Sequence, residues 1–262
     1  MNSALTNIAQ DSISIGKSID NYQVKTVVVG IRYTGLLLSN GSVGVAYTLF
    51  DKRTEKESHL EYLSTKYLYE KSLDELIEFC NSKLAVFRSI GAAALCAYSQ
   101  ANLPPTNMDY KDVSELFHSD LSTTVGMIGN IHPISKFLVK RGFKLKILDK
   151  SFSPEQTSQI IPVNTVKELT DVQHLIVSGS ALVFDNFSQI IDILPLIRGE
   201  KVLIGPSAQI IPKIAFNMGF TFIGSSKIRN SRLTLSTIME GGGYRAFKPH
   251  TEKYSFQASE VD

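Results

Sequence analysis

The chain has 262 residues, 43% of them hydrophobic and 20% charged, a composition that is typical of a folded protein and excludes a disordered one. Its 27 Lys and Arg residues nearly balance 25 Asp and Glu residues, and the net charge of +2 argues against a dedicated nucleic-acid-binding protein, which would carry a basic face. No apolar run could span a membrane, no secretory signal is visible, and two cysteines are too few for a disulfide framework, so a cytoplasmic protein is expected.

The first half of the chain predicts a β-hairpin. Runs rich in β-branched and aliphatic residues favour strands at residues 25–30, 36–38 and 43–49. Asn40-Gly41 lies between the last two runs and is the strongest short signal for a hairpin turn. We therefore expect the second and third strands to pair through a tight turn.

Two helices are predicted after this hairpin. Ser72 and Glu75 have the spacing of a capping box, and the apolar residues that follow, Cys80 included, recur at helical spacing. Cys80 is therefore expected in the core, as unpaired cysteines usually are. Residues 86–100 are rich in alanine and predict a helix that is closely packed on several faces and ends before Pro104.

A polar stretch at residues 106–120 separates two different patterns and predicts a linker. The hairpin and its helices precede this stretch, whereas strands alternate with helices after it. We place the domain boundary between Pro105 and Asp120, with a first domain at residues 1–118 and a second at residues 119–262.

The second half has the pattern of a parallel sheet. Helices are expected to begin at Pro133, near Phe187 and near Pro212. Strand-like runs alternate with them at residues 123–128, 143–148, 174–177, 201–204 and 220–223. This alternation predicts βαβ units and an α/β domain with a parallel sheet.

Small and polar residues follow each of these predicted strands. In an open parallel sheet, ligands bind at the carboxyl ends of the strands, where glycine lets the backbone approach a ligand and helix N-termini favour anionic groups. The predicted ligand-binding residues are Gly129, Asn130, His132, Asp149, Ser178, Gly179, Ser180, Gly205, Pro206, Ser207, Gly224 and Ser225. At any single turn, a purely structural role of the glycine is the alternative.

Asp149 lies 20 residues beyond Gly129, which is the separation of the ribose-binding carboxylate in a dinucleotide-binding fold. Residues 126–129 are nevertheless not the G-x-G-x-x-G fingerprint, so no particular cofactor is assigned. We expect Gly129, Ser180 and Ser207 to offer backbone or hydroxyl donors to anionic or carbonyl groups of a ligand. Asp149 is expected to accept hydrogen bonds from the ligand's hydroxyl or amino groups.

The spacing of residues gives no support to metal or serine-nucleophile chemistry. The five histidines are scattered, no C-x-x-C or H-E-x-x-H pattern occurs, and no metal site is predicted. His132 is the one histidine at a strand-end turn, where capping a helix and contacting a ligand are both open roles. His174, just before a buried strand, is expected to be structural. The sequence has no G-x-S-x-G nucleophile elbow.

A further signal comes from residues 28–34, 41–48, 125–129, 177–180, and 204–207 with Pro212. These segments resemble the DUF364 family, a heavy-metal-chelation domain by name, and the DUF4213 domain that precedes it. The resemblance extends from about Val24 to Gly243, and Gly205-Pro206-Ser207 with its downstream proline is its most specific part. It implies an enolase N-terminal-like α+β domain joined to a Rossmann-like domain, with the site in the cleft between them.

Two positions depart from the family's pattern. The family carries asparagine in the small-residue helix where this chain has Cys96, and asparagine after the Gly-Ser turn where this chain has Phe184. Asp185 and Asn186 lie beside the second position.

The resemblance and the strand-end residues together favour a protein that binds a nucleotide-, pterin- or adenosyl-type small molecule in an interdomain cleft. The implied setting is the biosynthesis of a metal chelator or a cofactor. The alternative is a non-catalytic protein that binds a heavy metal or a metallophore, which would need several Cys, His or carboxylate side chains together; the sequence shows no such local cluster. Neither an enzymatic activity nor a homo-oligomer is decided by the sequence.

Overall fold

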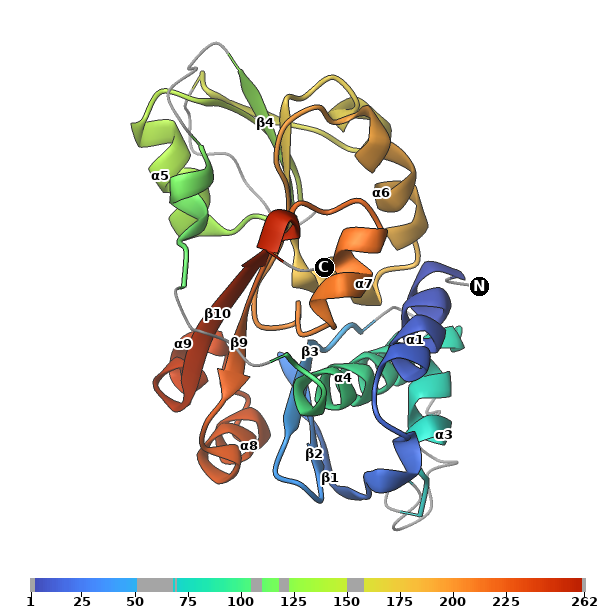
Figure 1. Ribbon diagram of the computed structural model, residues 1–262. Helices are drawn as coiled ribbons and strands as arrows, with labels where there is room; N and C mark the ends of the chain where they lie inside the picture. Colours follow the sequence, from blue (N-terminus) through green and yellow to red (C-terminus); the bar gives the residue numbers. More distant parts are fainter. Residues whose placement is uncertain are drawn as a thin grey trace.

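The computed structural model describes residues 3–50, 68, 70–104, 110–117, 123–149 and 158–260. Within these residues the chain forms two units, one around a three-stranded sheet and one around a seven-stranded sheet (Figure 1). The predicted fold class, a parallel-sheet α/β domain preceded by a smaller α+β domain, is confirmed. The predicted domain boundary, between residues 118 and 119, lies outside the described residues.

The first unit contains an antiparallel sheet of β1 (Val24–Val29), β2 (Tyr33–Leu38) and β3 (Val43–Tyr47), paired in that order. Gly41, in the turn between β2 and β3, has a φ of +86°, a conformation that glycine adopts without strain. The hairpin predicted from Asn40-Gly41 is therefore confirmed.

The helices of the first unit are α1 (Ser3–Ile15), α3 (Leu73–Glu78) and α4 (Ala85–Ala101), with the short 3-10 helices η1 (Ile19–Asn21) and η3 (Phe79–Asn81). α4 lies on β2 and β3, and a side chain at Gly44 of β3 would collide with the backbone of Ala93 and Ala97. Small residues on both elements therefore allow this close contact. The predicted capping box at Ser72 is present, and Cys80 is fully buried as expected.

The second unit contains β4 (Thr124–Ile128), β5 (Lys144–Leu148), β6 (Ile160–Pro162), β7 (His174–Ser178), β8 (Lys201–Ile204), β9 (Phe222–Ile228) and β10 (Thr251–Gln257). The order in the sheet is β10-β9-β8-β7-β4-β5-β6, and every neighbouring pair is parallel except β9 with β10. Between β5 and β7 the chain crosses from one side of β4 to the other, as in Rossmann-like sheets.

The helices that follow these strands are α5 (His132–Lys140), α6 (Phe187–Ile193), α7 (Pro212–Asn217), α8 (Ser231–Met239) and α9 (Tyr244–Phe247). The 3-10 helices of this half are η4 (Val113–Leu116), η5 (Val166–Leu169), η6 (Gly179–Val183), η7 (Leu194–Leu196), η8 (Lys248–His250) and η9 (Ala258–Glu260). α5 and α6 lie on opposite sides of the sheet (Figure 1), with Leu138 of α5 in one core cluster and Ile190 of α6 in another. No helix among the described residues is long and apolar enough to cross a membrane.

The end of the sheet differs from the prediction. The strand predicted at residues 220–223 does not stop before Gly224 and Ser225, because β9 continues through both to Ile228. Ser225 and Ser226 are buried in the strand, and the hydroxyl of each makes a hydrogen bond. Serine here is compatible with a buried strand, whereas the sequence pattern indicated the strand's end.

The two units are joined by buried contacts of α4 and β3. The side chain of Gln209, which follows β8, accepts a hydrogen bond from the Val45 N–H of β3 at 2.8 Å and donates one to the Ser226 carbonyl of β9 at 2.6 Å. The largest hydrophobic cluster includes residues of both units, among them Ala93 of α4 and Val177 of β7. The carboxyl edge of the larger sheet therefore faces α4 of the first unit.

Candidate functional site

The centre of the candidate site is the crossover point between β4 and β7. From β4 the chain adds β5 and β6 on one side, and from β7 it adds β8 and β9 on the other. Folds of this type bind ligands above the strand ends at the point where the strand order reverses. Gly129 follows β4 directly, and Ser178 is the last residue of β7. The sequence-predicted residues at this point are therefore neighbours in space.

Gly129 is held in a conformation that suits glycine, with a φ of +76°. A Cβ atom on Gly129 would lie 2.9 Å from the Cβ atom of Ser178 and 3.8 Å from the hydroxyl of Ser180. The Ser178 and Ser180 hydroxyls are 2.9 Å apart and both residues are partly exposed. One hydroxyl donates to the other, so the second proton of the pair can be donated to a third group.

Asp149, at the end of β5, connects that strand to the turn after β4. Its carboxylate accepts a hydrogen bond from the Asn130 N–H at 2.7 Å. The side-chain oxygen of Asn130 in turn accepts a hydrogen bond from Ser135 of α5 at 2.9 Å. Asp149 and Asn130 therefore lie together at this edge, and their expected contacts with a ligand stay a prediction.

The turn after β8 lies on the other side of β7. Gly205 has a φ of +126°, its N–H donates to the Gly224 carbonyl at 3.0 Å, and its carbonyl accepts from the Ser225 hydroxyl at 2.9 Å. Gly224 and Ser225 are thus beside this turn although they do not end a strand. Gly179 is buried against the backbone of Ala208, and a side chain at Gly179 would collide with it.

Ser207 and Pro206 complete this turn beneath α4. Pro206 is partly exposed and Ser207 is buried, and the Ser207 carbonyl accepts a weak hydrogen bond from the Cys96 thiol at 3.8 Å. Burial raises the pKa of Cys96 to about 12, so this thiol is protonated at neutral pH. Phe184, the second departure from the family's pattern, lies on the surface with 37% of its area exposed.

The two histidines near the sheet have different surroundings. His132 is exposed at the first residue of α5, beside the turn that contains Asn130. His174 accepts a hydrogen bond from the Glu200 N–H through Nδ1 at 2.9 Å, and its ring packs against Phe117. Burial lowers the pKa of His174.

Buried polar side chains that sequence reasoning did not single out also surround this edge. They are Arg88 and Gln100 of α4, Gln209 after β8, Ser226 of β9 and Tyr254 of β10. Arg88 and Gln100 lie in a helix whose other residues are mostly apolar, and a long polar side chain there is a signal that could have been followed. Tyr254 belongs to a strand that no apolar run marks, so its position gave no such signal.

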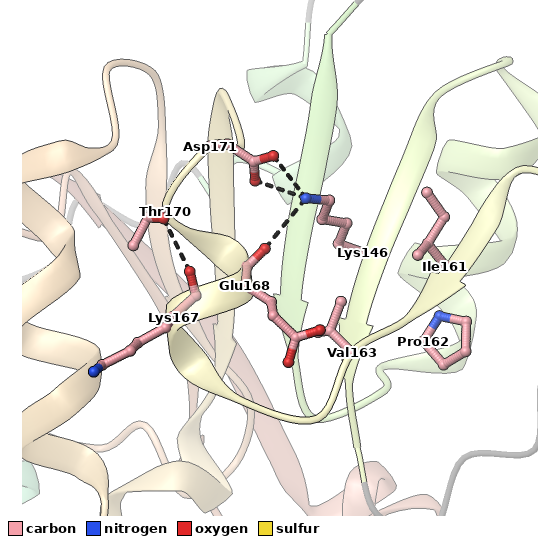
Figure 2. Close-up of a pocket in the computed structure, with 8 residues that line it drawn as sticks. All are labelled: Lys146, Ile161, Pro162, Val163, Lys167, Glu168, Thr170 and Asp171. Atoms are coloured by element: carbon pink, nitrogen blue, oxygen red, sulfur yellow. Dashed lines mark hydrogen bonds and ion pairs between the residues drawn. The ribbon is translucent and has the colours of Figure 1, made fainter.

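Two cavities lie away from these residues. The first, of about 340 Å³, is on the face of β5 and β6, where Lys146 makes two 2.7 Å hydrogen bonds to the carboxylate of Asp171 (Figure 2). The second, of about 450 Å³, lies between η1 and the start of α3. Neither cavity is lined by a predicted site residue, and neither lies between the two units.

Among the described residues, no group of three or more His, Cys, Asp and Glu side chains is placed to hold a metal ion.

Comparison with known proteins identifies similar chains. Family models match residues 14–99 (DUF4213) and 112–257 (DUF364), and both carry the description "Putative heavy-metal chelation". An uncharacterized protein of Methanocaldococcus jannaschii is 26% identical over an alignment of 243 residues, and the match covers 91% of this chain and 91% of that protein. These matches cover both units of the structure.

Two solved structures share the fold. A DUF364 protein of unknown function from Pyrococcus horikoshii has a TM-score of 0.80 and 23% identity, with 97% of this chain and 100% of that chain covered. A DUF364 protein from Desulfitobacterium hafniense has a TM-score of 0.74 and 17% identity, with coverages of 97% and 98%. At these identities, the two structures support the fold of both units.

Proposed function

The chain belongs to the DUF364 family, and we propose that it binds a small molecule at the carboxyl edge of its seven-stranded sheet, beneath α4. The ligand is of the nucleotide, pterin or adenosyl type. The setting is the cytoplasmic biosynthesis of a metal chelator or a cofactor, which fits the family's description and the two unpaired, buried cysteines.

One observation carries this proposal: Gly129, at the crossover between β4 and β7, has a positive φ and faces the Ser178 and Ser180 hydroxyls. The absence of a side chain at Gly129 leaves the backbone and these hydroxyls next to each other at the place where Rossmann-like sheets bind their ligands. A partly exposed hydroxyl pair can donate to a phosphate, carboxylate or carbonyl oxygen.

The surrounding groups suit a polar ligand with an anionic or carbonyl group. α5 begins at His132 beside the same turn, and helix N-termini favour negative charge. Asp149, at the end of the next strand, supplies the carboxylate that a ribose or amino group would need. The site thus combines donors over β4 and β7 with an acceptor over β5.

The test is a thermal-shift screen of nucleotides, pterins and adenosyl compounds on the wild type and on the double variant Ser178→Ala/Ser180→Ala. Ser14→Ala is the control, because Ser14 is exposed on α1 at the surface of the first unit. We expect a ligand that stabilises the wild type and the control equally and the double variant much less. A ligand that stabilises all three proteins equally binds elsewhere and contradicts the assignment.

The same screen includes divalent nickel, cobalt and zinc without any organic compound. Stabilisation by a metal ion alone, together with no response to any organic compound, would support the competing function of heavy-metal binding and contradict the proposal.

A further inference from the structure

Three side chains at the adjoining ends of β2 and β3 carry hydrogen-bond donors that are not used. They belong to Arg32, which is exposed, to Tyr33, which is partly buried, and to Tyr47, which is 37% exposed. In the part of the chain that the structure describes, the Arg32 guanidinium and the two phenol hydroxyls make no hydrogen bond or ion pair. Since Arg32 and Tyr47 are exposed, a ligand can reach these donors from solvent.

The phenol rings lie where the first unit meets the second. Tyr33 of β2 is opposite Tyr47 of β3 in the sheet register, and the centroids of their rings are 6.4 Å apart. Tyr33 and Tyr244 of α9 both pack edge-on against Phe247, with centroid distances of 5.3 and 5.4 Å. Phe247 is fully buried. The rings from β2, β3 and α9 therefore form one cluster.

The backbone and the side-chain stem of Arg32 hold this residue beside the cluster. Its carbonyl accepts a hydrogen bond from the Thr48 N–H at 3.1 Å, which fixes Arg32 next to the end of β3. A Cβ atom on Gly243 would lie 3.3 Å from the Cδ atom of Arg32, so the stem of the side chain lies on the residue before Tyr244. The guanidinium charge also lowers the pKa of Tyr33, as expected for a group close to that hydroxyl.

The charge around Tyr33 favours an anion. Burial raises the pKa of Tyr33 to about 12, so its hydroxyl keeps the proton at neutral pH and stays a donor. The other groups that act on this pKa are Tyr244, Tyr47 and Arg32. No described carboxylate is among them, and Arg32 is the one that is charged at neutral pH. A cation would therefore meet a like charge here, whereas an anion would meet an opposite one.

Tyr244 supplies a further donor from the second unit. Its hydroxyl is 2.8 Å from the hydroxyl of Ser226, which is buried in β9. One hydroxyl of this pair donates to the other, so the second proton can be donated to a third group.

We propose that Arg32, Tyr33 and Tyr47, with Tyr244 beside them, bind an oxyanion at the junction of the two units. The ligand is a phosphate or carboxylate group, because guanidinium and hydroxyl groups are the donors that such anions accept from. The inference does not need the proposed function, since none of these residues belongs to the strand-end site. It adds a binding site to which both units contribute.

Calorimetric titration of the full chain with inorganic phosphate, acetate and phenyl phosphate tests the inference, with sodium chloride of equal ionic strength as the blank. Acetate distinguishes a carboxylate from a phosphate, and phenyl phosphate distinguishes a phosphoryl group on an organic molecule from the free ion. We expect the wild type to bind at least one of the three.

Two variants remove the donors while they keep the packing. Arg32→Met retains the stem on Gly243, and Tyr33→Phe/Tyr47→Phe retains both rings. Each should weaken binding about tenfold or more, because charge-assisted hydrogen bonds to the anion are lost. Arg198→Met, at an exposed arginine after η7, is the matched control and should bind as the wild type does.

The outcomes separate this site from the proposed ligand site. The variant Ser178→Ala/Ser180→Ala should still bind the anion. If that variant loses the anion while Arg32→Met keeps it, the anion belongs to the strand-end site and the inference is wrong, although the proposed function gains support. Binding of none of the three anions by the wild type, or an equal loss in Arg198→Met, also overturns the inference.

Thermal unfolding supplies a second readout. Without an anion, Arg32→Met and Tyr33→Phe/Tyr47→Phe should melt close to the wild type, because the removed groups have no partner. The anion should raise the melting temperature of the wild type and leave that of Arg32→Met unchanged. A melting temperature several degrees below the wild type in the anion-free double variant would make these hydroxyls structural and overturn the inference.

Discussion

Gly129 is constrained both by its backbone conformation and by its surroundings. Its φ of +76° disfavours any residue with a side chain, and the place of a Cβ atom is 2.9 Å from the Cβ atom of Ser178. Gly41, in the β2–β3 turn, has a similar φ of +86° but has no atom within 4 Å of the place of its Cβ. A comparison of substitutions at the two glycines therefore distinguishes the free-energy cost of the positive φ from the cost of the steric contact with Ser178.

We predict that Gly129→Ala lowers the free energy of unfolding more than Gly41→Ala does. Conformational strain alone should cost Gly41→Ala about 1 kcal/mol, and the contact with Ser178 should bring the loss in Gly129→Ala to about 2–3 kcal/mol. Denaturant titrations monitored by circular dichroism measure both losses.

Ser178→Gly tests whether the contact with Ser178 causes the extra loss, because it removes the Cβ atom that the new methyl group would meet in Gly129→Ala. The double variant Gly129→Ala/Ser178→Gly should recover part of the stability lost in Gly129→Ala. Equal losses at Gly129 and Gly41 would show that the contact with Ser178 does not constrain the site.

At the scale of elements, α4 is held to the second unit by Arg88, whose side chain is only 3% exposed. Its Nε donates to the Val183 carbonyl in η6, and its NH1 group donates to the carbonyls of Ser82 and Lys83. Its NH2 group pairs at 3.1 Å with Asp185, which is 78% exposed. Arg88 thus connects α4 to the short helix η6, which begins directly after Ser178.

We predict that Arg88→Met destabilises the protein by about 3 kcal/mol, because it leaves three carbonyls without their buried donor. Asp185→Asn removes only the exposed partner and should cost less than about 1 kcal/mol. Chemical denaturation of both variants measures the difference. Similar losses in the two variants would mean that the carbonyl contacts contribute little to the attachment of α4.

The elements that could be predicted from the sequence are those whose signal is local. Asn40-Gly41 indicated its hairpin, Ser72 with Glu75 indicated the start of α3, and alternating strands and helices indicated the parallel sheet. β10 was missed because it is a sheet-edge strand whose residues are mostly polar and half-buried. Its pairing with β9 depends on contacts distant in the sequence, which no local pattern records.

The candidate site divides in the same way. Glycine and serine residues after the strands were predictable, because parallel strands bring their carboxyl ends to one edge. The sequence could mark Arg88 and Gln100 as polar residues of an apolar helix, but the partners of these two residues and of Gln209 were not predictable, since each partner is far away in the sequence. Long-range hydrogen bonds of side chains follow from the packing of the two units, which the sequence alone does not provide.

At the scale of the whole molecule, the stretch between Pro105 and Asp120 is the place where we predict the domain boundary. Val113 and Phe117, inside that stretch, are buried against the second unit, with Phe117 packed against Phe143 and His174. A protease should therefore cut this stretch on either side of residues 113–117 and spare η4.

Limited proteolysis followed by mass spectrometry locates the first cut. Because the hydrophobic core is continuous across the two units, the two fragments should still elute together in size-exclusion chromatography. First cuts within residues 113–117, or fragments that elute separately, would contradict this view of the molecule.

Gln209 has a second consequence, which concerns the two edge strands of the smaller sheet, β3 and β1. An unpaired edge strand can add a strand from another molecule, and this is a common start of aggregation. At β3 the amide of Gln209 occupies the place of a neighbouring peptide group, because it takes the Val45 N–H and passes a hydrogen bond on to Ser226. At β1, the opposite edge, the register is irregular between Val24 and Thr26, and the exposed Lys25 places a charge there. One edge is thus closed by a side chain and the other is guarded by a charge, so that both oppose the addition of a foreign strand.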